Sequence, residues 1–253
     1  MGKIIAVVNQ KGGVGKTTTT VSLISSLGEK KKKTLLVDID PQANATSGLG
    51  GGKRSTEKTT YDMLIGSAKP EEILLHTAFK GVDLLPSGIA LAGAEVEMVE
   101  LSRRESRLKA ALATLRDDYD YILIDCPPSL GLLTLNALCA ADTVLVPIQC
   151  EFYALEGLSQ LMATVRQVKR LYNAPLELEG VVMTMYDKRL NLTKQVADEV
   201  EKFFPGKVFS TVIPRTVRLS EAPSYGQPIN YYDHASKGAR AYRKLAGEII
   251  KKG

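Results

Sequence analysis

The feature that most constrains this chain is the run "NQKGGVGKTTTT", residues 9–20, which lies between an apolar stretch and a helical pattern. The stretch before it, "KIIAVVN" (3–9), is typical of a buried strand, and we expect a helix to begin near Lys16. A glycine-rich turn in this context points backbone N–H groups and the positive end of a helix toward one place. Strand, turn and helix together predict an α/β fold with a phosphate-binding loop.

The loop departs in two respects from the general phosphate-binding motif, G-x-x-x-x-G-K-[ST]. Gln10 stands where that motif requires its first glycine, and an additional lysine, Lys11, precedes the glycines. The rest of the pattern fits, because the glycines free the backbone to turn, Lys16 can reach the β- and γ-phosphates, and the Thr17 hydroxyl can bind Mg²⁺. The loop residues expected to contact a nucleotide are Lys11, Gly12, Gly13, Val14, Gly15, Lys16, Thr17 and Thr18.

Short apolar runs alternate with helical patterns along the rest of the chain. Further strands are predicted at 34–40, 82–86, 121–127, 143–149, 179–186 and 207–213. Most of these runs are continuously apolar, as expected for parallel strands that are covered on both faces. Helical patterns lie between them, as at 102–117, and the glycine-rich polar segment 47–60 is expected to be a surface loop. We therefore predict a doubly wound, mostly parallel sheet with helices on both faces, in a single domain spanning 1–253.

Three aspartates follow predicted strands, at the edge of the sheet where ligands bind in such folds. Asp38 and Asp40 end the run 34–40, and Asp125 follows the apolar residues "YILI". Carboxylates at strand ends can simply form turns, as the pair Asp40-Pro41 would. Their occurrence together with the glycine-rich loop favours a position near the phosphates and the metal.

Composition excludes several classes of protein. The three cysteines, Cys126, Cys139 and Cys150, lack C-x-x-C spacing, which disfavours a zinc site or a disulfide framework. No apolar run approaches the roughly 20 residues of a membrane span, and the N-terminus has no signal-peptide pattern, so we predict a cytoplasmic protein. The net charge of +5 permits an acidic partner without requiring one.

The spelling K-G-G-x-G-K-T is that of the deviant Walker A motif, and with it the chain resembles the ParA/Soj-type partitioning ATPases. These belong to a wider class that includes MinD and the nitrogenase iron protein. The resemblance covers nearly the whole chain, in the blocks 37–50, 119–138, 146–161 and 212–229. It implies a P-loop NTPase fold, binding of ATP with Mg²⁺, and a homodimer that forms when ATP binds.

The resemblance also implies roles for the residues around the phosphates. Lys16 would act on the nucleotide of its own subunit, whereas Lys11 would reach the phosphates of ATP held by the partner, so that nucleotide state becomes dimer state. Asp40 would position the attacking water. Asp38 would belong to the magnesium and phosphate network, and Asp125 would hold Mg²⁺ through water.

The residues that recognise the adenine base and the ribose are less clear from the sequence. The resemblance places the base near Pro214 and Arg215, and Glu151 near the ribose. Because no motif carries an obvious strong base, we expect slow hydrolysis until a partner stimulates it.

Basic residues from three segments suggest that the ATPase binds double-stranded DNA. Those expected to contact DNA are Lys188, Arg189, Arg218, Lys237 and Arg240. No base-reading motif accompanies them, so binding would be to the phosphate backbone and indifferent to sequence, giving a nucleoid-associated protein. The resemblance adds a ParB/Spo0J-type partner that triggers hydrolysis. Without the resemblance, solvated surface charges would explain these residues equally well.

Two other outputs occur within the same class of ATPases. A MinD-like positioning ATPase would bind membrane through a terminal amphipathic helix, but the apolar stripe of the predicted helix 234–252 suits packing on the sheet. A shared metal cluster, as in the nitrogenase iron protein, would need cysteines at a dimer axis, and these cysteines lie in or beside predicted core strands. The chain also shows no helix-turn-helix segment before its loop, which is typical of the short ParA type.

Overall fold

The computed structural model describes residues 1–51, 57–151 and 154–253. Within these residues the chain forms a seven-stranded sheet in the order β3-β4-β2-β5-β1-β6-β7. Neighbouring strands pair in parallel except for β3 and β4, which are antiparallel. The strands are β1 (Lys3–Val7), β2 (Thr34–Asp38), β3 (Leu75–His76), β4 (Val82–Leu85), β5 (Tyr121–Asp125), β6 (Thr143–Gln149) and β7 (Glu177–Thr184).

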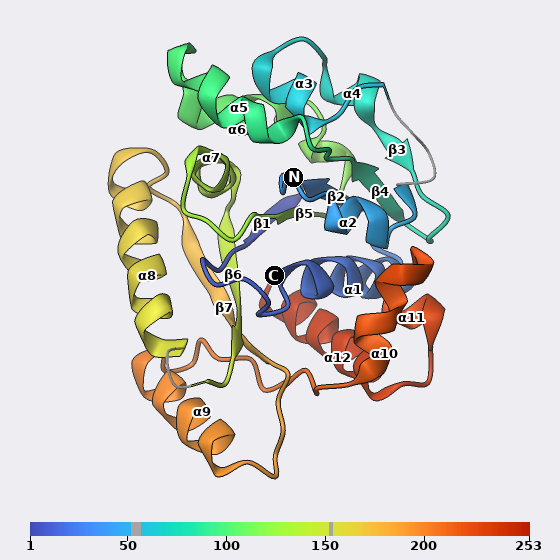
Figure 1. Cartoon of the computed structure of the whole chain (residues 1–253), viewed down its shortest axis with the longest axis vertical. Coiled ribbons are helices and arrows are strands. Elements are labelled where there is room, and N and C mark those ends of the chain that lie inside the picture. The colour runs from blue at the N-terminus through green and yellow to red at the C-terminus, as the bar shows by residue number, and fades with distance from the viewer. Residues whose placement is uncertain (52–56, 152–153) are drawn as a thin grey trace.

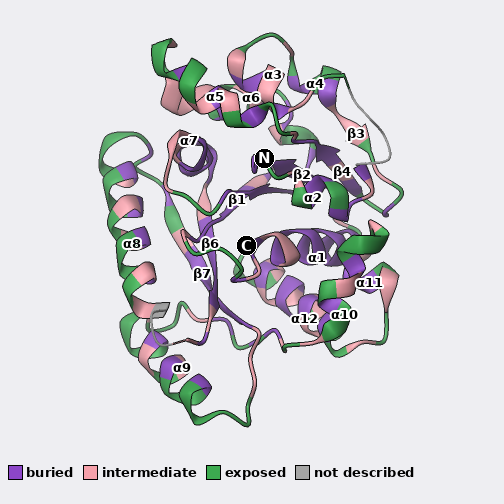
Figure 2. Cartoon of the chain, viewed as in Figure 1, coloured by how far each residue is buried: buried purple, intermediate pink, exposed green. Residues whose placement is uncertain are grey.

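Both faces of the sheet are buried, which explains why the strands read as continuous apolar runs. In and after β1, Ile4, Ala6 and Val8 belong to one hydrophobic cluster, whereas Ile5 and Val7 belong to the cluster on the opposite face. Successive side chains of a strand point to opposite faces, so a strand covered on both sides needs apolar residues at every position. Figure 2 shows the strands buried along most of their length, with exposure on the outer surfaces of the helices.

The helices divide between the two faces, as the doubly wound prediction requires (Figure 1). The first cluster is completed by α3 (Thr60–Ile65), α4 (Pro70–Ile73), α5 (Leu91–Glu97), α6 (Arg107–Leu112), α7 (Leu132–Ala140), α8 (Ala154–Leu171) and α9 (Asn191–Phe203). The second is completed by α1 (Lys16–Glu29), α2 (Asn44–Gly48), α10 (Val217–Glu221), α11 (Ile229–Tyr232) and α12 (Lys237–Lys252). The predicted fold class is confirmed.

The strand predicted at 207–213 is wrong. The segment runs beside β7, but it forms only isolated bridges, to Val181 and, just past its end, to Tyr186. The N–H of Phe209 donates to the carbonyl of Val181 at 2.9 Å, but the next bond to β7 comes from the N–H of Ile213, to Met183 at 2.8 Å. A regular ladder would use the N–H of Thr211 there, so the pairing is interrupted between the two bridges. Conversely, the two-residue edge strand β3 is too short to leave a sequence pattern.

The helix predicted at 102–117 is also wrong as a single element. The segment is divided into η3 (Arg104–Ser106), α6 (Arg107–Leu112) and η4 (Arg116–Asp118). The side chain of Asn136 accepts a hydrogen bond from the N–H of Leu108 at 3.1 Å and donates one to the carbonyl of Arg104 at 2.8 Å. These two backbone groups would bond to each other in a continuous helix. The leucines of this helical pattern nevertheless face the core: Leu108, Leu112 and Leu115 are buried, and Leu101 just before the segment is half-buried.

The C-terminal helix agrees with its prediction. Its first turn is capped by Ser236, whose hydroxyl accepts from the N–H of Ala239 at 3.1 Å. The predicted stripe is buried as a unit: Ala239, Tyr242, Leu245, Ala246 and Ile249. The surface loop predicted at 47–60 includes the end of α2 and the start of α3, and its residues 52–56 lie outside the described residues.

Candidate functional site

The glycine-rich loop follows the central strand β1 and ends at the first residue of α1. Gly13 and Gly15 have positive φ angles of 74° and 86°, a conformation that favours glycine, and Gly15 is the N-cap of α1. A Cβ at Gly13 would meet no atom within 4 Å, so the loop borders open space there. From below, the Thr184 hydroxyl at the end of β7 donates to the carbonyl of Val14 at 2.7 Å. The loop is therefore open to solvent on the side of Gly13 and held to the end of β7 through Val14; we call this open loop the cradle.

The two lysines of the loop occupy different environments. Lys16 is 6% exposed, and its Nζ donates to the carbonyl of Lys11 at 3.1 Å. Burial lowers the pKa of Lys16, and the charge of Asp125 opposes this shift. The side chain of Lys11 is 43% exposed and forms an ion pair with Glu151. Lys16 is thus enclosed by the fold, whereas Lys11 is partly exposed and held by a surface carboxylate.

Two carboxylates lie side by side at the carboxyl edge of the sheet. Asp38 and Asp125 are register partners on β2 and β5, and both are fully buried. Asp125 accepts hydrogen bonds from the hydroxyls of Thr17 and Thr20, each at 2.8 Å. Burial, together with the charge of Asp38, raises the pKa of Asp125 to about 8. A carboxylate joined to a hydroxyl at the helix start is the oxygen set that Mg²⁺ prefers, so these residues fit the ion.

Asp38 lies beside that pair, but its oxygens are used within the fold. One oxygen accepts from the N–H of Asp40 at 3.0 Å, and the other accepts from the N–H and hydroxyl of Thr46, each at 2.8 Å. Burial raises the pKa of Asp38 to about 6, against the lowering effect of these bonds. The Asp40 carboxylate, which is nearer the surface, accepts from the N–H of Gln42 at 2.9 Å. The structure thus brings Asp38, Asp40 and Asp125 to one edge, with different partners for each.

A pocket of about 310 Å³ adjoins the cradle on the α10 side. Its walls include Gly15 and Thr18 from the loop and helix, and Pro214 and Arg215, the residues predicted to lie near the base. The pocket therefore joins the loop to the residues predicted to lie near the base. Glu151 is not among its lining residues, and its side chain contacts Lys11 instead.

Three of the basic residues expected to contact DNA line a second groove, together with Arg215. Lys188, Arg189, Arg215 and Lys237 come from three separate segments and meet there with Tyr186. Arg189 is paired with Asp187 through both its Nε, at 2.9 Å, and its guanidinium NH₂, at 2.6 Å. Within the described residues, Lys188, Arg215 and Lys237 form no ion pair.

Arg218 and Arg240 do not line this groove. Arg218 on α10 is paired with Glu221 at 3.1 Å and with Asp233 at 3.4 Å, and lies over the ring of Tyr232. Arg240 is exposed and lies one turn after Lys237 on α12. The basic residues therefore form a groove of four and two outlying positions.

The sequence reasoning missed several residues that support the site. Thr184 holds the loop from below, Thr20 completes the partners of Asp125, and Asn9 donates to the carbonyl of Pro147 at 2.8 Å while accepting from the N–H of Lys11. The run of threonines was itself a signal for Thr20, because threonine is a poor helix former and four of them begin α1. Thr184 carries no local signal, since its partner is 170 residues away.

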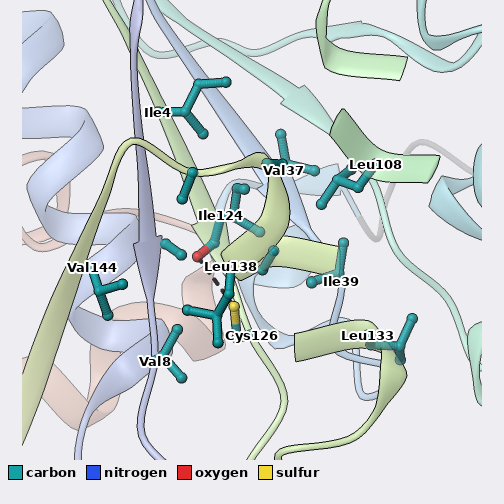
Figure 3. Close-up of a cluster of buried hydrophobic side chains, with 14 of the residues drawn as sticks. Ile4, Val8, Val37, Ile39, Leu108, Ile124, Cys126, Leu133, Leu138 and Val144 are labelled. Atoms are coloured by element: carbon teal, nitrogen blue, oxygen red, sulfur yellow. Dashed lines mark hydrogen bonds between the residues drawn. The ribbon is translucent and has the colours of Figure 1, made fainter. Parts of the chain in front are cut away.

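The cysteines have the environment of packing residues. All three are buried and free. Cys126 lies among apolar side chains beside Ile124, with its sulfur 3.8 Å from that residue's carbonyl oxygen (Figure 3). No cluster of three or more potential metal-ligating His, Cys, Asp or Glu residues occurs in the described ranges. None of the helices in the described part of the chain combines the length and apolarity that crossing a membrane requires.

Comparison with known proteins gives consistent matches. A family described as an AAA domain matches residues 2–178. The sporulation initiation inhibitor protein Soj of Bacillus subtilis is 57% identical over 253 residues, covering 100% of both chains. The chromosome partitioning protein ParA of Myxococcus xanthus is 51% identical over 252 residues, covering 100% of this chain and 89% of that one.

Two solved structures extend the comparison to bound molecules and to the fold. A cobyrinic acid a,c-diamide synthase from Mycobacterium smegmatis, with bound ADP and magnesium, aligns with a TM-score of 0.87 at 40% identity, covering 99% of this chain and 95% of that one. The cell division ATPase MinD of Pyrococcus furiosus aligns with a TM-score of 0.84 at 31% identity, covering 100% of both chains.

Proposed function

The chain belongs to the Soj and ParA family of partitioning ATPases, and from this premise we propose that it is an ATP-dependent dimerising switch that partitions DNA. The observation that carries the proposal is the separation of its two loop lysines. Lys16 is enclosed beside the cradle, whereas Lys11 is partly exposed and paired with Glu151 on the surface. An exposed cation that can exchange such a partner is available to a second subunit.

We propose ATP and Mg²⁺ as the cofactors of this site. The open cradle of Gly13 and Gly15, the enclosed Lys16 and the adjoining base pocket suit a nucleoside triphosphate. Thr17 and Asp125 would hold Mg²⁺, which supplies positive charge against the phosphates when bound. The similar synthase from Mycobacterium smegmatis, solved with bound ADP and magnesium, supports this assignment.

In this proposal Asp40 orients the water that attacks the γ-phosphate. Its carboxylate is at the same edge as the Thr17–Asp125 pair and is held by a backbone N–H. A carboxylate of this kind directs water without acting as a strong base, so intrinsic hydrolysis should be slow, at about 10⁻³ per second or somewhat above. A ParB/Spo0J-type partner would provide the stimulation.

The output of the switch is non-specific binding to double-stranded DNA. Lys188 and Lys237 have no carboxylate partner among the described residues and line one groove with Arg189 and Arg215. If each subunit neutralises about three phosphates, an ATP dimer neutralises about six, and the log–log salt slope of DNA binding should be near −5 at roughly −0.9 per phosphate. Joining the two grooves makes the second contact effectively intramolecular, so DNA binding should follow dimerisation. We accordingly propose a cytoplasmic, nucleoid-associated protein in which residues 1–253 act as one ATPase domain.

The test measures dimerisation and DNA binding in the same samples. The protein is studied with ATP, ADP and no nucleotide, by analytical ultracentrifugation and by fluorescence anisotropy on two unrelated duplexes. We expect a dimer and DNA binding only with ATP, with equal affinity for both duplexes and loss at raised salt. Equal DNA binding in all three nucleotide states would refute the switch. ATP-dependent pelleting with anionic vesicles but not with DNA would instead favour the MinD-like alternative.

A further inference from the structure

Hydrogen bonds fix the backbone on both sides of Asp40. Its N–H donates to Asp38 at 3.0 Å, and its carbonyl accepts from the hydroxyl of Ser87 at 2.7 Å and from the N–H of Ala43 at 2.9 Å. Both peptide groups that flank the Asp40 Cα are therefore restrained. With the backbone held, the hydrogen bond that the Asp40 carboxylate accepts from the N–H of Gln42 at 2.9 Å sets where the side chain lies.

The hydroxyl of Thr46 closes these contacts into a ring. It donates to Asp38 at 2.8 Å and accepts from the N–H of Ser87 at 2.9 Å. The ring thus joins the end of β2, the helix α2 and the segment after β4. Thr46 and Ser87 are 5% and 6% exposed, and a buried ring of satisfied hydrogen bonds resists displacement because a broken member is left without water to replace its partner.

We propose that Thr46 and Ser87 are positioning residues for hydrolysis: together with Asp38 they form a clamp that holds the Asp40 carboxylate at the place where it orients the attacking water. The inference rests on the proposed function, because it takes the role of Asp40 from there. It also gives Asp38 a different task from contact with magnesium or phosphate, since both of its oxygens already accept hydrogen bonds from the clamp.

The clamp should act on the rate of hydrolysis rather than on the affinity for ATP. None of the ring's hydrogen bonds involves the glycine-rich loop. Orientation of reacting groups is sensitive to displacements of about 1 Å, which can cost on the order of a hundredfold in rate. A loosened clamp therefore leaves the nucleotide bound and the water poorly directed.

The experiment compares Thr46→Val with Thr46→Ser in single-turnover hydrolysis, ATP titration and ultracentrifugation. Valine keeps the shape and removes the hydroxyl, whereas serine keeps it. We expect Thr46→Val to hydrolyse ATP about tenfold to hundredfold more slowly, with an ATP dissociation constant within about twofold of the parent and an intact ATP dimer. Thr46→Ser should recover most of the rate. Ser87→Ala, which removes the bond to the Asp40 carbonyl, should slow hydrolysis in the same way.

Thr34→Val is the matched control. Thr34 is a buried threonine at the opposite end of β2, and its hydroxyl donates to the carbonyl of Gly81 at 2.7 Å. It should lose comparable thermal stability and keep its rate of hydrolysis. The clamp is refuted if Thr46→Val hydrolyses ATP at the parental rate, if Thr46→Ser is as slow as Thr46→Val, or if Thr34→Val is slowed equally.

Asp40→Ala, measured alongside, separates failure of the clamp from failure of the proposed function. If Asp40→Ala hydrolyses ATP at the parental rate, Asp40 does not orient the water and the proposed function fails at that point. If Asp40→Ala is slow but Thr46→Val hydrolyses ATP normally, only the clamp is refuted.

Discussion

Two regions are built on opposite principles: the carboxyl edge of the sheet beside the glycine-rich loop, here called the nucleotide edge, and the groove lined by Lys188, Arg189, Arg215 and Lys237, here called the basic groove. At the nucleotide edge, the functional groups Lys16, Asp38 and Asp125 are buried, and each hydrogen-bonds to a nearby polar group. In the basic groove, Lys188 and Lys237 are exposed and have no carboxylate partner among the described residues. The first region depends on positions set in advance by the fold, and the second depends on accumulated charge. Single substitutions should therefore have large, specific effects at the edge and small, graded effects in the groove.

The largest expected effect is at Lys16. Removal of an enclosed cation that faces phosphates should weaken ATP binding on the order of a hundredfold or more in Lys16→Ala. Lys11→Ala, five residues earlier in the loop, should bind ATP within about threefold of the parent and fail to dimerise. Nucleotide titration with sedimentation decides between them, and an equal loss of ATP affinity in both variants would contradict the division of roles between the two lysines.

The next effect is on hydrolysis alone. Asp40→Ala should bind ATP and form a stable dimer, while its hydrolysis falls about a hundredfold or more because the attacking water is no longer directed. Phosphate release from a preformed ATP dimer measures this rate. A loss of ATP binding in this variant would mean that Asp40 also helps to bind the nucleotide. Binding and hydrolysis would then share residues at this edge of the sheet.

Substitutions in the groove should act by small steps. Lys237→Ala should weaken DNA binding on every duplex and make the salt slope of the dimer shallower by about 2, for one phosphate lost per subunit. Arg218→Ala should change the slope less, because that side chain is already paired with Glu221 and Asp233. Anisotropy titrations over a range of salt give both slopes. A larger change for Arg218→Ala would place the DNA on α10 rather than in the groove.

The smallest effect concerns the link between the two regions. The hydroxyls of Thr19 on α1 and Tyr242 on α12 lie 3.1 Å apart in the core between the nucleotide helix and the helix that carries Lys237. Tyr242→Phe should lower the free energy of unfolding by about 1 kcal/mol and leave ATP and DNA affinities unchanged. Chemical denaturation measures the first. A marked loss of ATP-dependent DNA binding would show that this contact transmits the nucleotide state.

The same contrast separates what could be predicted from the sequence from what could not. The loop, the strand-end aspartates and the stripe of α12 are local patterns, and their geometry follows from strand and helix periodicity. The division of the segment 102–117 could not be predicted, because it depends on Asn136, whose side chain comes from another helix. The supports of the site, Thr184 and Ser87, are likewise brought in by the fold and not by neighbours in the chain.

The basic groove shows a further limit of this kind. The sequence predicted that Arg189 and Arg218 contact DNA. It did not reveal that Asp187 is paired with Arg189, and Glu221 and Asp233 with Arg218, which partly neutralises both cations. The side chain and backbone of Arg189 hold the pKa of Asp187 at about 2, so this carboxylate stays charged throughout the physiological range. The number of charges free for DNA therefore had to come from the structure.

The segment from Pro214 to Thr216 lines both the base pocket and the basic groove. A wall shared by two compartments makes their occupants thermodynamically reciprocal: if a base in one compartment moves the wall, the factor by which ATP strengthens DNA binding is also the factor by which DNA strengthens ATP binding. The molecule would then hold ATP more tightly while it lies on DNA than in free solution, so DNA itself would help to keep the ATP state populated.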